Sequence, residues 1–277
     1  MALPDLPPFR SAVWRVLGST LLAGTLGLTF VLSRRGSERR PVVQQGSLEG
    51  FEAGQQGGYG TLTERLGRGR FDLHYAGIEG RKTDLRLRGV DGRLEEPEAS
   101  WRLLSPSAHR AQEGVWDLDG PVRIEGRDGS GAEIGNGEAG GAGPALRWEK
   151  GAWIGLAPLQ WQSLEGQGRG RWTLPAGWRR EGDGVLKVQQ GPVAWEAPAG
   201  SQLQRMVAQR LQLSPNFEAG RLEDVEAGFS DGTVWAKRAD FTRSVITWHA
   251  PIRFARQDGW MGEAEGGSET DCMRILR

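Results

Sequence analysis

The chain has 277 residues, with 35 basic and 35 acidic side chains and therefore a formal net charge of zero. This balance gives no electrostatic reason to expect nucleic-acid binding. The single cysteine, Cys272, excludes an intrachain disulfide and a cysteine-rich metal site. Glycine is frequent, at 43 residues, and 12 tryptophans accompany only 2 tyrosines. This composition favours short strands joined by tight turns over long helices.

An apolar stretch near the N-terminus, residues 16–32, contains no charged side chain. A helix over this stretch spans roughly 25 Å at about 1.5 Å per residue, and residues 12–14 extend it towards the ~30 Å of a bilayer. The alternative is a cleaved signal peptide, but Ser33, Arg34 and Arg35 follow where small residues should guide cleavage. We therefore predict an uncleaved membrane anchor over residues 1–32, with its helix at about 12–32.

Small residues recur on one face of this predicted helix, because Ser19, Ala23 and Gly27 are spaced four apart. Such a face allows another membrane helix to approach closely, although small residues are also common in membrane helices generally. We predict that these three residues mediate membrane-helix association.

The charges around the apolar stretch conflict with an exported domain. Two arginines precede the stretch and four follow it: Arg34, Arg35, Arg39 and Arg40. Taken alone, this distribution favours a cytoplasmic C-terminal side, but long domains cross membranes largely regardless of flanking charge.

After the anchor, residues 33–60 are rich in charge, Gly, Gln and Ser and show no periodicity, so we predict a flexible linker. Apolar and polar residues then alternate over 71–75, 84–88 and 99–103, a pattern typical of half-buried strands. The Gly-rich stretch 126–143 is predicted to be a long loop or a hairpin tip. Residues 202–213 fit a helix and a strand equally well. We predict a β domain over 61–267 and a C-terminal tail over 268–277.

An internal repeat is the most informative feature of this domain. Residues 114–129, 184–200 and 244–259 each contain an alternating strand, a Gly-Pro or Ala-Pro break and a second alternating strand. The prolines, Pro121, Pro192 and Pro251, fix φ and lack an N–H donor, so each fits a strand start, an edge or a bulge. We therefore predict that the long strands bend at a common level of the fold.

Alternation also predicts which side chains of each repeat share one face. These residues are Trp116, Leu118, Val122 and Ile124 in the first repeat, Leu186, Val188, Val193 and Trp195 in the second, and Ile246, Trp248, Ile252 and Phe254 in the third. Similar strands stacked in order predict two facing sheets, or a folded-over sheet, with a shared apolar interior. These inward side chains are equally the pattern of an ordinary dry core.

The repeats resemble the Lpt (OstA-like) family of lipopolysaccharide transport proteins, in particular its membrane-anchored, LptC-like members. The resemblance is carried by the anchor before an all-β domain, by LDGPVRIEGRDG at 118–129, and by four C-terminal runs in order. These runs are AQRLQLSP (208–215), SDGTVWAKRADF (230–241), APIRFARQDG (250–259) and MGEAEGG (261–267). The chain departs from the family in its greater length, its 126–143 stretch and its flanking charges.

This resemblance implies a fold and a function. The fold is a β-jellyroll, or β-taco, of antiparallel strands in the periplasm, attached to the inner membrane by one helix. The function is to accept lipopolysaccharide from an inner-membrane ABC transporter and pass it to a periplasmic bridge protein of the same fold, with the acyl chains in the apolar groove. The twelve inward residues are then the lipid-binding groove, and no enzyme activity or cofactor is expected.

Catalytic and metal sites have little support in the sequence. His74, His109 and His249 lie in separate segments without metal-ligand spacing. Glu95 and Glu96 lie in a polar turn and are predicted to be solvated, and Cys272 lies in the tail as an inert thiol. The competing interpretation is an anchored β-rich binding or structural protein whose tryptophans recognise glycan or protein. Solvent-facing tryptophans would support that function, whereas tryptophans between the sheets would support lipid transfer.

Overall fold

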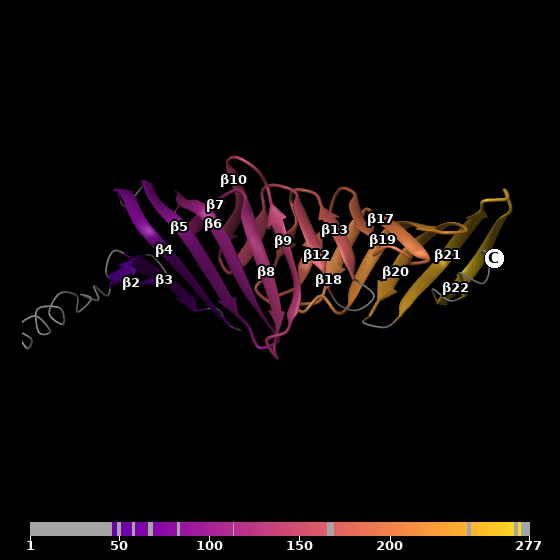
Figure 1. The fold of residues 1–277 in the computed structure, drawn as a ribbon, viewed down its shortest axis with the longest axis horizontal. Helices are drawn as coiled ribbons and strands as arrows, with labels where there is room; N and C mark the ends of the chain where they lie inside the picture. Colours follow the sequence, from indigo (N-terminus) through magenta and orange to yellow (C-terminus); the bar gives the residue numbers. More distant parts are fainter. Residues whose placement is uncertain are drawn as a thin grey trace, which may run out of the picture. The chain divides into compact units, whose positions relative to one another are not determined.

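The computed structural model describes residues 46–48, 51–56, 59–65, 69–81, 84–112, 114–164, 169–242, 245–268 and 271–272. The chain forms two units, Met1–Gln44 with Gln55–Gly57 and Gln45–Gly54 with Gly58–Arg277. The second unit is antiparallel β-sheet, and residues 271 and 272 are its only helical residues within the described ranges (Figure 1). This confirms the predicted mainly β fold.

The predicted anchor helix at 12–32, with Ser19, Ala23 and Gly27, lies outside the described residues. Within the part of the chain that the structure describes, no helix has the length and apolar character needed to cross a bilayer.

Long strands open the sheet. β3 (Tyr59–Arg65), β4 (Arg70–Arg81), β5 (Asp84–Glu95) and β6 (Ala99–Gln112) pair in chain order. The predicted alternation is confirmed here, since Phe71, Leu73 and Tyr75 are buried while Asp72 and His74 between them are partly exposed. Before these strands, β1 (Gly46–Leu48) and β2 (Phe51–Gln56) form a hairpin inside the stretch predicted as a linker.

The sheet divides at β6. Residues 108–112 of β6 pair with β7 (Val115–Asp119), whereas residues 99–104 pair with β8 (Val122–Asp128). From this point two layers continue side by side. Layer A comprises β7, β10 (Pro144–Glu149), β11 (Ala152–Gly155), β14 (Arg179–Arg180), β15 (Leu186–Val188) and β18 (Arg210–Leu213). Layer B comprises β8, β9 (Glu133–Ala139), β12 (Leu159–Ser163), β13 (Gly170–Leu174), β16 (Val193–Glu196) and β17 (Leu203–Ala208).

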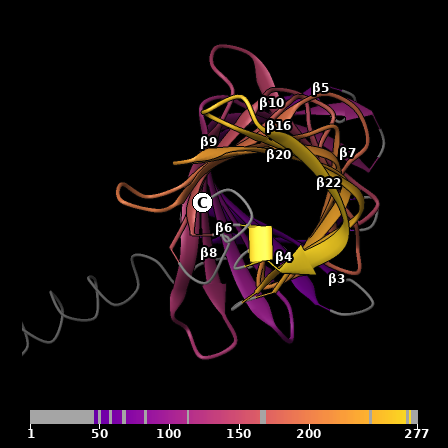
Figure 2. The same cartoon turned by 90° about the vertical axis from the view of Figure 1, so that its right-hand side faces the viewer.

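The chain passes back and forth between the layers until both meet at β19 (Gly220–Phe229). Residues 220–223 of β19 pair with β18 of layer A, and residues 226–229 pair with β17 of layer B. β20 (Gly232–Phe241), β21 (Ile246–Arg256) and β22 (Met261–Ser268) then follow as single strands that span both layers. Figure 2 shows strands of this unit curving around one interior.

The layers join along a crease, defined as the line where strands of layer A pass into layer B. Pro121 lies between β7 and β8, and Pro192 lies between β15 and β16. Pro251 lies within β21, where the pairing register with β22 shifts between His249 and Ile252. Proline suits these positions because it donates no ladder hydrogen bond. The three repeated prolines therefore lie at one structural level, as their recurrence at the same place in each repeat predicts.

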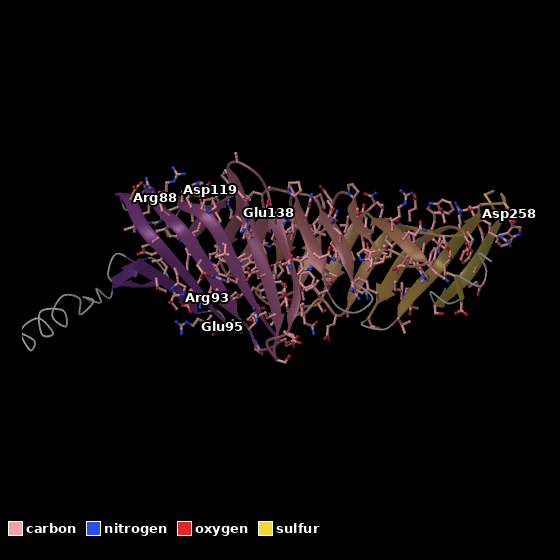
Figure 3. All side chains as sticks on the ribbon, in the orientation of Figure 1. Arg88, Arg93, Glu95, Asp119, Glu138 and Asp258 are labelled. Carbon is pink, nitrogen blue, oxygen red and sulfur yellow. The ribbon has the colours of Figure 1, made fainter. Side chains whose placement is uncertain are left out.

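The core is a single cluster of buried side chains contributed by both layers and by the long strands at either end. Nine tryptophans belong to it: Trp101, Trp116, Trp148, Trp153, Trp161, Trp172, Trp178, Trp195 and Trp248. Charged side chains occupy the outer surface, as for Arg93 and Glu138 in Figure 3.

Two ambiguous stretches are resolved. The Gly-rich stretch 126–143 is mostly strand, because it contains the end of β8, a short turn and all of β9. Three of its glycines, Gly126, Gly135 and Gly137, pack under tryptophan rings: a Cβ on Gly135 would lie 2.5 Å from the Trp161 ring. The long-loop alternative is therefore wrong, because β8 and β9 pair as a hairpin with a short tip, and close packing accounts for these three glycines. Residues 202–213 form β17 and β18, so the strand alternative is the right one.

Candidate ligand-binding interior

All twelve predicted groove residues face the interior and are at most 4% exposed. They are Trp116, Leu118, Val122, Ile124, Leu186, Val188, Val193, Trp195, Ile246, Trp248, Ile252 and Phe254. In each repeat the first pair lies before the crease and the second pair after it. The repeats occupy β7–β8, β15–β16 and β21, which are different parts of the sheet. These residues therefore line a continuous apolar interior, and they do not gather in one pocket.

Aromatic contacts connect the two sides of this interior. Phe71 on β4 stacks on Trp148 of layer A, with ring centroids 4.1 Å apart and an interplanar angle of 22°. Trp101 on the layer B half of β6 meets Trp153 of layer A edge to face at 6.4 Å. Such geometries add favourable quadrupole interactions to apolar burial. The layers are thus held together by large rings in the region between β4 and β14.

One aromatic side chain comes from a turn. Phe217 lies between β18 and β19, and its ring centroid is 5.2 Å from that of Trp101 and 5.4 Å from that of Trp161. Its φ of 61° falls in the left-handed region, which costs a non-glycine residue about 1–2 kcal/mol. Ring packing compensates this strain, so the turn closes the interior beside layer B.

Two carboxylates enter this apolar region. Trp148 Nε1 donates a hydrogen bond of 2.5 Å to Glu64 on β3. Burial raises the pKa of Glu64, and the indole hydrogen bond partly opposes that rise. The second carboxylate, Glu96, forms an ion pair with Arg180 of layer A, and the two side chains are 8% and 3% exposed. Glu95 is solvent-exposed as predicted, but the prediction of a solvated Glu96 is wrong.

Arg180 was missed by the sequence reasoning, which concentrated on the proline-centred repeats. The sequence nevertheless holds a signal, since Trp178 and Arg180 are two residues apart; the structure buries both. Strand parity places such residues on one face. Several donors of the interior lack a hydrogen-bond partner among the described residues. They are Arg180 Nε and the indole N–H groups of Trp101, Trp153, Trp161, Trp178 and Trp248.

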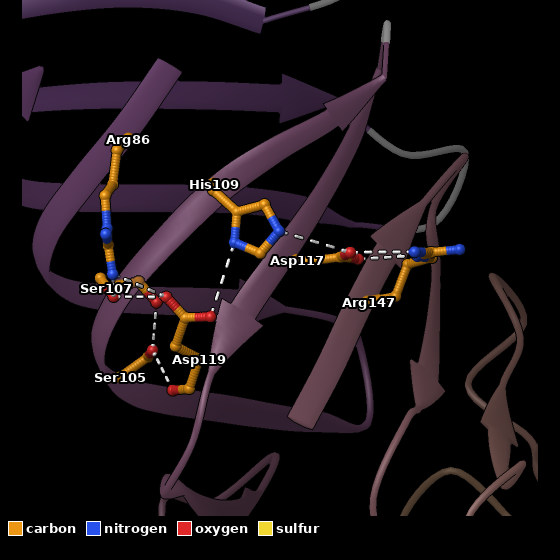
Figure 4. A network of polar contacts seen from close by, with 7 residues as sticks. All are labelled: Arg86, Ser105, Ser107, His109, Asp117, Asp119 and Arg147. Carbon is orange, nitrogen blue, oxygen red and sulfur yellow. Dashed lines mark hydrogen bonds and ion pairs between the residues drawn. The ribbon is translucent and has the colours of Figure 1, made fainter. Parts of the chain in front are cut away.

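The crease carries a polar network on its outer side (Figure 4). Arg147 donates two hydrogen bonds to Asp117, of 2.7 and 2.9 Å, and Ser107 Oγ donates one of 2.5 Å to Asp119. The His109 ring lies between the two carboxylates, 3.8 Å from Asp117 and 3.5 Å from Asp119. The Ser107 hydroxyl bonds a carboxylate and not an imidazole, so this is not a nucleophile–base pair. The network joins β6, β7 and β10.

The other two histidines make polar contacts as well. His74 Nδ1 lies 2.9 Å from Thr61 Oγ1, and His249 Nε2 lies 2.9 Å from Asp240 Oδ2. Among the described residues, no group of three or more His, Cys, Asp or Glu side chains is placed to hold a metal ion. Cys272, from the predicted tail, is buried in the core.

No family model, curated protein or solved structure matches this chain. The resemblance of the repeats to the Lpt (OstA-like) family therefore stays a prediction.

Proposed function

We propose that this chain is a membrane-anchored lipid-transfer protein of the cell envelope. Its second unit is a β-jellyroll, or β-taco, that carries acyl chains between its layers. In this proposal it receives lipopolysaccharide from an inner-membrane ABC transporter and passes it to a periplasmic bridge protein of the same fold. The domain is not an enzyme and needs no cofactor.

The continuous apolar interior is the observation that carries this proposal. Nine tryptophans and all twelve predicted groove residues lie in one buried cluster. Each CH₂ group of an acyl chain transferred from water to such a place contributes about 0.8 kcal/mol. Two layers joined along a crease also give the interior a way to open, because the layers are independent ladders between β6 and β19.

The last strand supports the proposed handover. Within the described residues, β22 pairs with β21 alone, so its second edge offers backbone donors and acceptors. A partner of the same fold can add a strand to such an edge. The predicted anchor, with Ser19, Ala23 and Gly27, is assigned to the transporter side.

A second function has a specific observation in its favour. Trp235, Trp260 and Met261 are 39%, 47% and 76% exposed near the end of the sheet. Trp235 and Met261 line a hollow of about 630 Å³ together with Arg253 and Glu263. Exposed indoles beside charged groups suit the recognition of a glycan or a protein. Most tryptophans nevertheless face inward, so lipid transfer is the better supported function.

Site-specific photo-crosslinking tests the acyl-binding interior. A benzophenone amino acid is placed at Trp116, Val193 or Trp248 in the full-length protein in growing cells. We expect ultraviolet-dependent adducts with lipid at all three positions, because each side chain is buried between the layers.

Arg123 and Thr247 serve as matched controls, since each follows a groove residue on the same strand and is exposed. Probes there should give no lipid adduct. The proposal would be refuted if mass spectra showed no lipid adduct at any of the three inward positions, in variants that keep the circular-dichroism signal of β structure.

A further inference from the structure

Arg180 places a positive charge inside the apolar interior. It lies on β14 opposite Trp153 of β11 and Leu186 of β15, both of which are buried. The Arg180 side chain is only 3% exposed. A buried charge is costly unless it is paired, so its partners determine what this position is suited to bind.

The resident partner is Glu96, which follows β5 in the turn before β6. Arg180 Nη1 donates to Glu96 Oε1 at 3.0 Å, and Nη2 donates to Oε2, so the carboxylate is held in a two-point fork. The guanidinium carbon lies 4.9 Å from the Trp101 ring centroid and 5.5 Å from that of Trp153. The two indoles fix the guanidinium in place by cation–π contacts.

Donors outnumber acceptors around this pair. Arg180 Nε, Trp101 Nε1 and Trp153 Nε1 are buried and lack hydrogen-bond partners among the described residues. Each unpaired buried donor carries a desolvation cost that no hydrogen bond offsets. A ligand that brings several acceptor oxygens would remove this cost, whereas a purely apolar ligand would not.

We propose that Arg180, with Trp101 and Trp153, forms a binding subsite for the anionic group of an acylated lipid. The carboxylate or phosphate of the lipid takes the place of Glu96 on the Arg180 fork, and the acyl chain continues into the apolar interior. Guanidinium planes bind both kinds of anion through two parallel hydrogen bonds. This subsite depends on the acyl-binding function proposed above.

Glu96 is suited to leave because it belongs to a turn and not to a strand ladder. Its backbone N–H is held by the carbonyl of Ala99, at 3.0 Å, so the turn persists when the side chain rotates outward. In the occupied state the carboxylate moves to solvent while the ligand anion neutralises Arg180. Glu96 thereby competes with the ligand and lowers its affinity.

This competition gives a direct test by equilibrium binding to the full-length protein in detergent. The probes are palmitate, palmitoyl lysophosphatidate and the neutral monopalmitoylglycerol. We expect Glu96→Gln to tighten anionic probes by about tenfold, since a competing charge-assisted bond is lost. Binding of the neutral probe should stay unchanged, and Glu98→Gln, at an exposed position of the same turn, should alter no probe.

A double variant keeps the test decisive if the Glu96→Gln protein does not fold. Arg180→Met with Glu96→Met replaces the ion pair by apolar side chains, a change that is often neutral for stability. We expect it to bind palmitate and monopalmitoylglycerol equally. The ratio of the two anionic probes distinguishes a carboxylate source from a phosphate source.

The outcomes separate the two proposals. Acyl probes that bind, with an anionic preference that neither variant changes, would overturn the subsite and leave acyl binding intact. Failure of all three probes, the neutral one included, to bind the wild-type protein would overturn acyl binding and the subsite with it.

Discussion

At the residue scale, Asp240 shows how the outer surface is organised. Its carboxylate accepts hydrogen bonds from Arg238 Nε, at 3.0 and 3.1 Å, and from Arg221 Nε, at 3.1 Å. The Arg238 hydrogen bond is the largest cause that lowers the pKa of Asp240, from 3.8 to about 2. These partners come from β19 and β20, so the carboxylate joins two long strands on their solvent side.

The pH dependence follows from this shift. A carboxyl with a lowered folded-state pKa stabilises the protein above its unfolded pKa, and this contribution is lost as pH falls from about 4 towards 2. We expect Asp240→Asn to lower the free energy of unfolding by about 1 kcal/mol at pH 7, after allowing for solvent screening. The difference from wild type should be smaller at pH 3, as measured by urea unfolding.

The control for this prediction is Asp258→Asn, whose side chain is 59% exposed and lies 3.3 Å from Arg256. It should change stability by less than about 0.5 kcal/mol. An Asp240→Asn protein with the same deficit at pH 3 and at pH 7 would contradict the assigned linkage.

At the element scale, close packing fixes how strands of layer A meet the turns beside them. A Cβ on Gly155 of β11 would lie 1.9 Å from Trp178 Nε1, and the Gly155 N–H donates to the Trp178 carbonyl at 2.8 Å. We expect Gly155→Ala to destabilise the protein by about 3 kcal/mol, because a fully buried indole would have to move. Thermal unfolding monitored by tryptophan fluorescence measures this loss.

Gly141→Ala is the matched control, since no atom lies within 4 Å of the added Cβ. It should leave the melting temperature nearly unchanged. Equal stability of the two variants would show that Trp178 does not pack against Gly155 in solution.

Much of this element arrangement follows from sequence parity, and some of it does not. Alternation predicts that Trp116 and Val122 point inward, because the direction of each side chain depends only on its place in its own strand. Pairing partners are not decided within one strand, since β8 pairs with the next strand, β9, whereas β7 pairs with β10. The division into two layers depends on which strands pair on each side of the crease. This pairing depends on all the strands together and cannot be derived from the sequence of one strand.

The candidate site shows the same limit. Its apolar lining follows from alternation within each strand and was predicted. The Arg180–Glu96 pair instead joins residues 84 positions apart. The local sequence predicts that a charged side chain in a polar turn is solvated, unless its partner across the interior is known. Glu96 is buried because Arg180 lies opposite it, and the sequence near Glu96 contains no sign of this.

At the scale of the whole molecule, the β unit and the predicted anchor have separate tasks in the proposed function. The β unit holds its apolar interior within its own sheet, from the long strands before β6 to those after β19. In that proposal, the predicted anchor presents its small-residue face to a membrane helix of the transporter. Loss of the anchor contact should therefore weaken association with the transporter without changing lipid affinity.

Co-purification of the full-length protein tests this division. We expect ABC transporter membrane subunits, identified by mass spectrometry, to co-purify from mild detergent. Substitution of Ser19, Ala23 and Gly27 by leucine should reduce their recovery about tenfold, because larger side chains prevent close helix approach. Thr25→Leu is the control, since on a helix it lies roughly opposite that face. Transporter subunits recovered equally with the triple variant would reject the assigned face, and a wild-type protein that never recovers them would reject the transporter partnership itself.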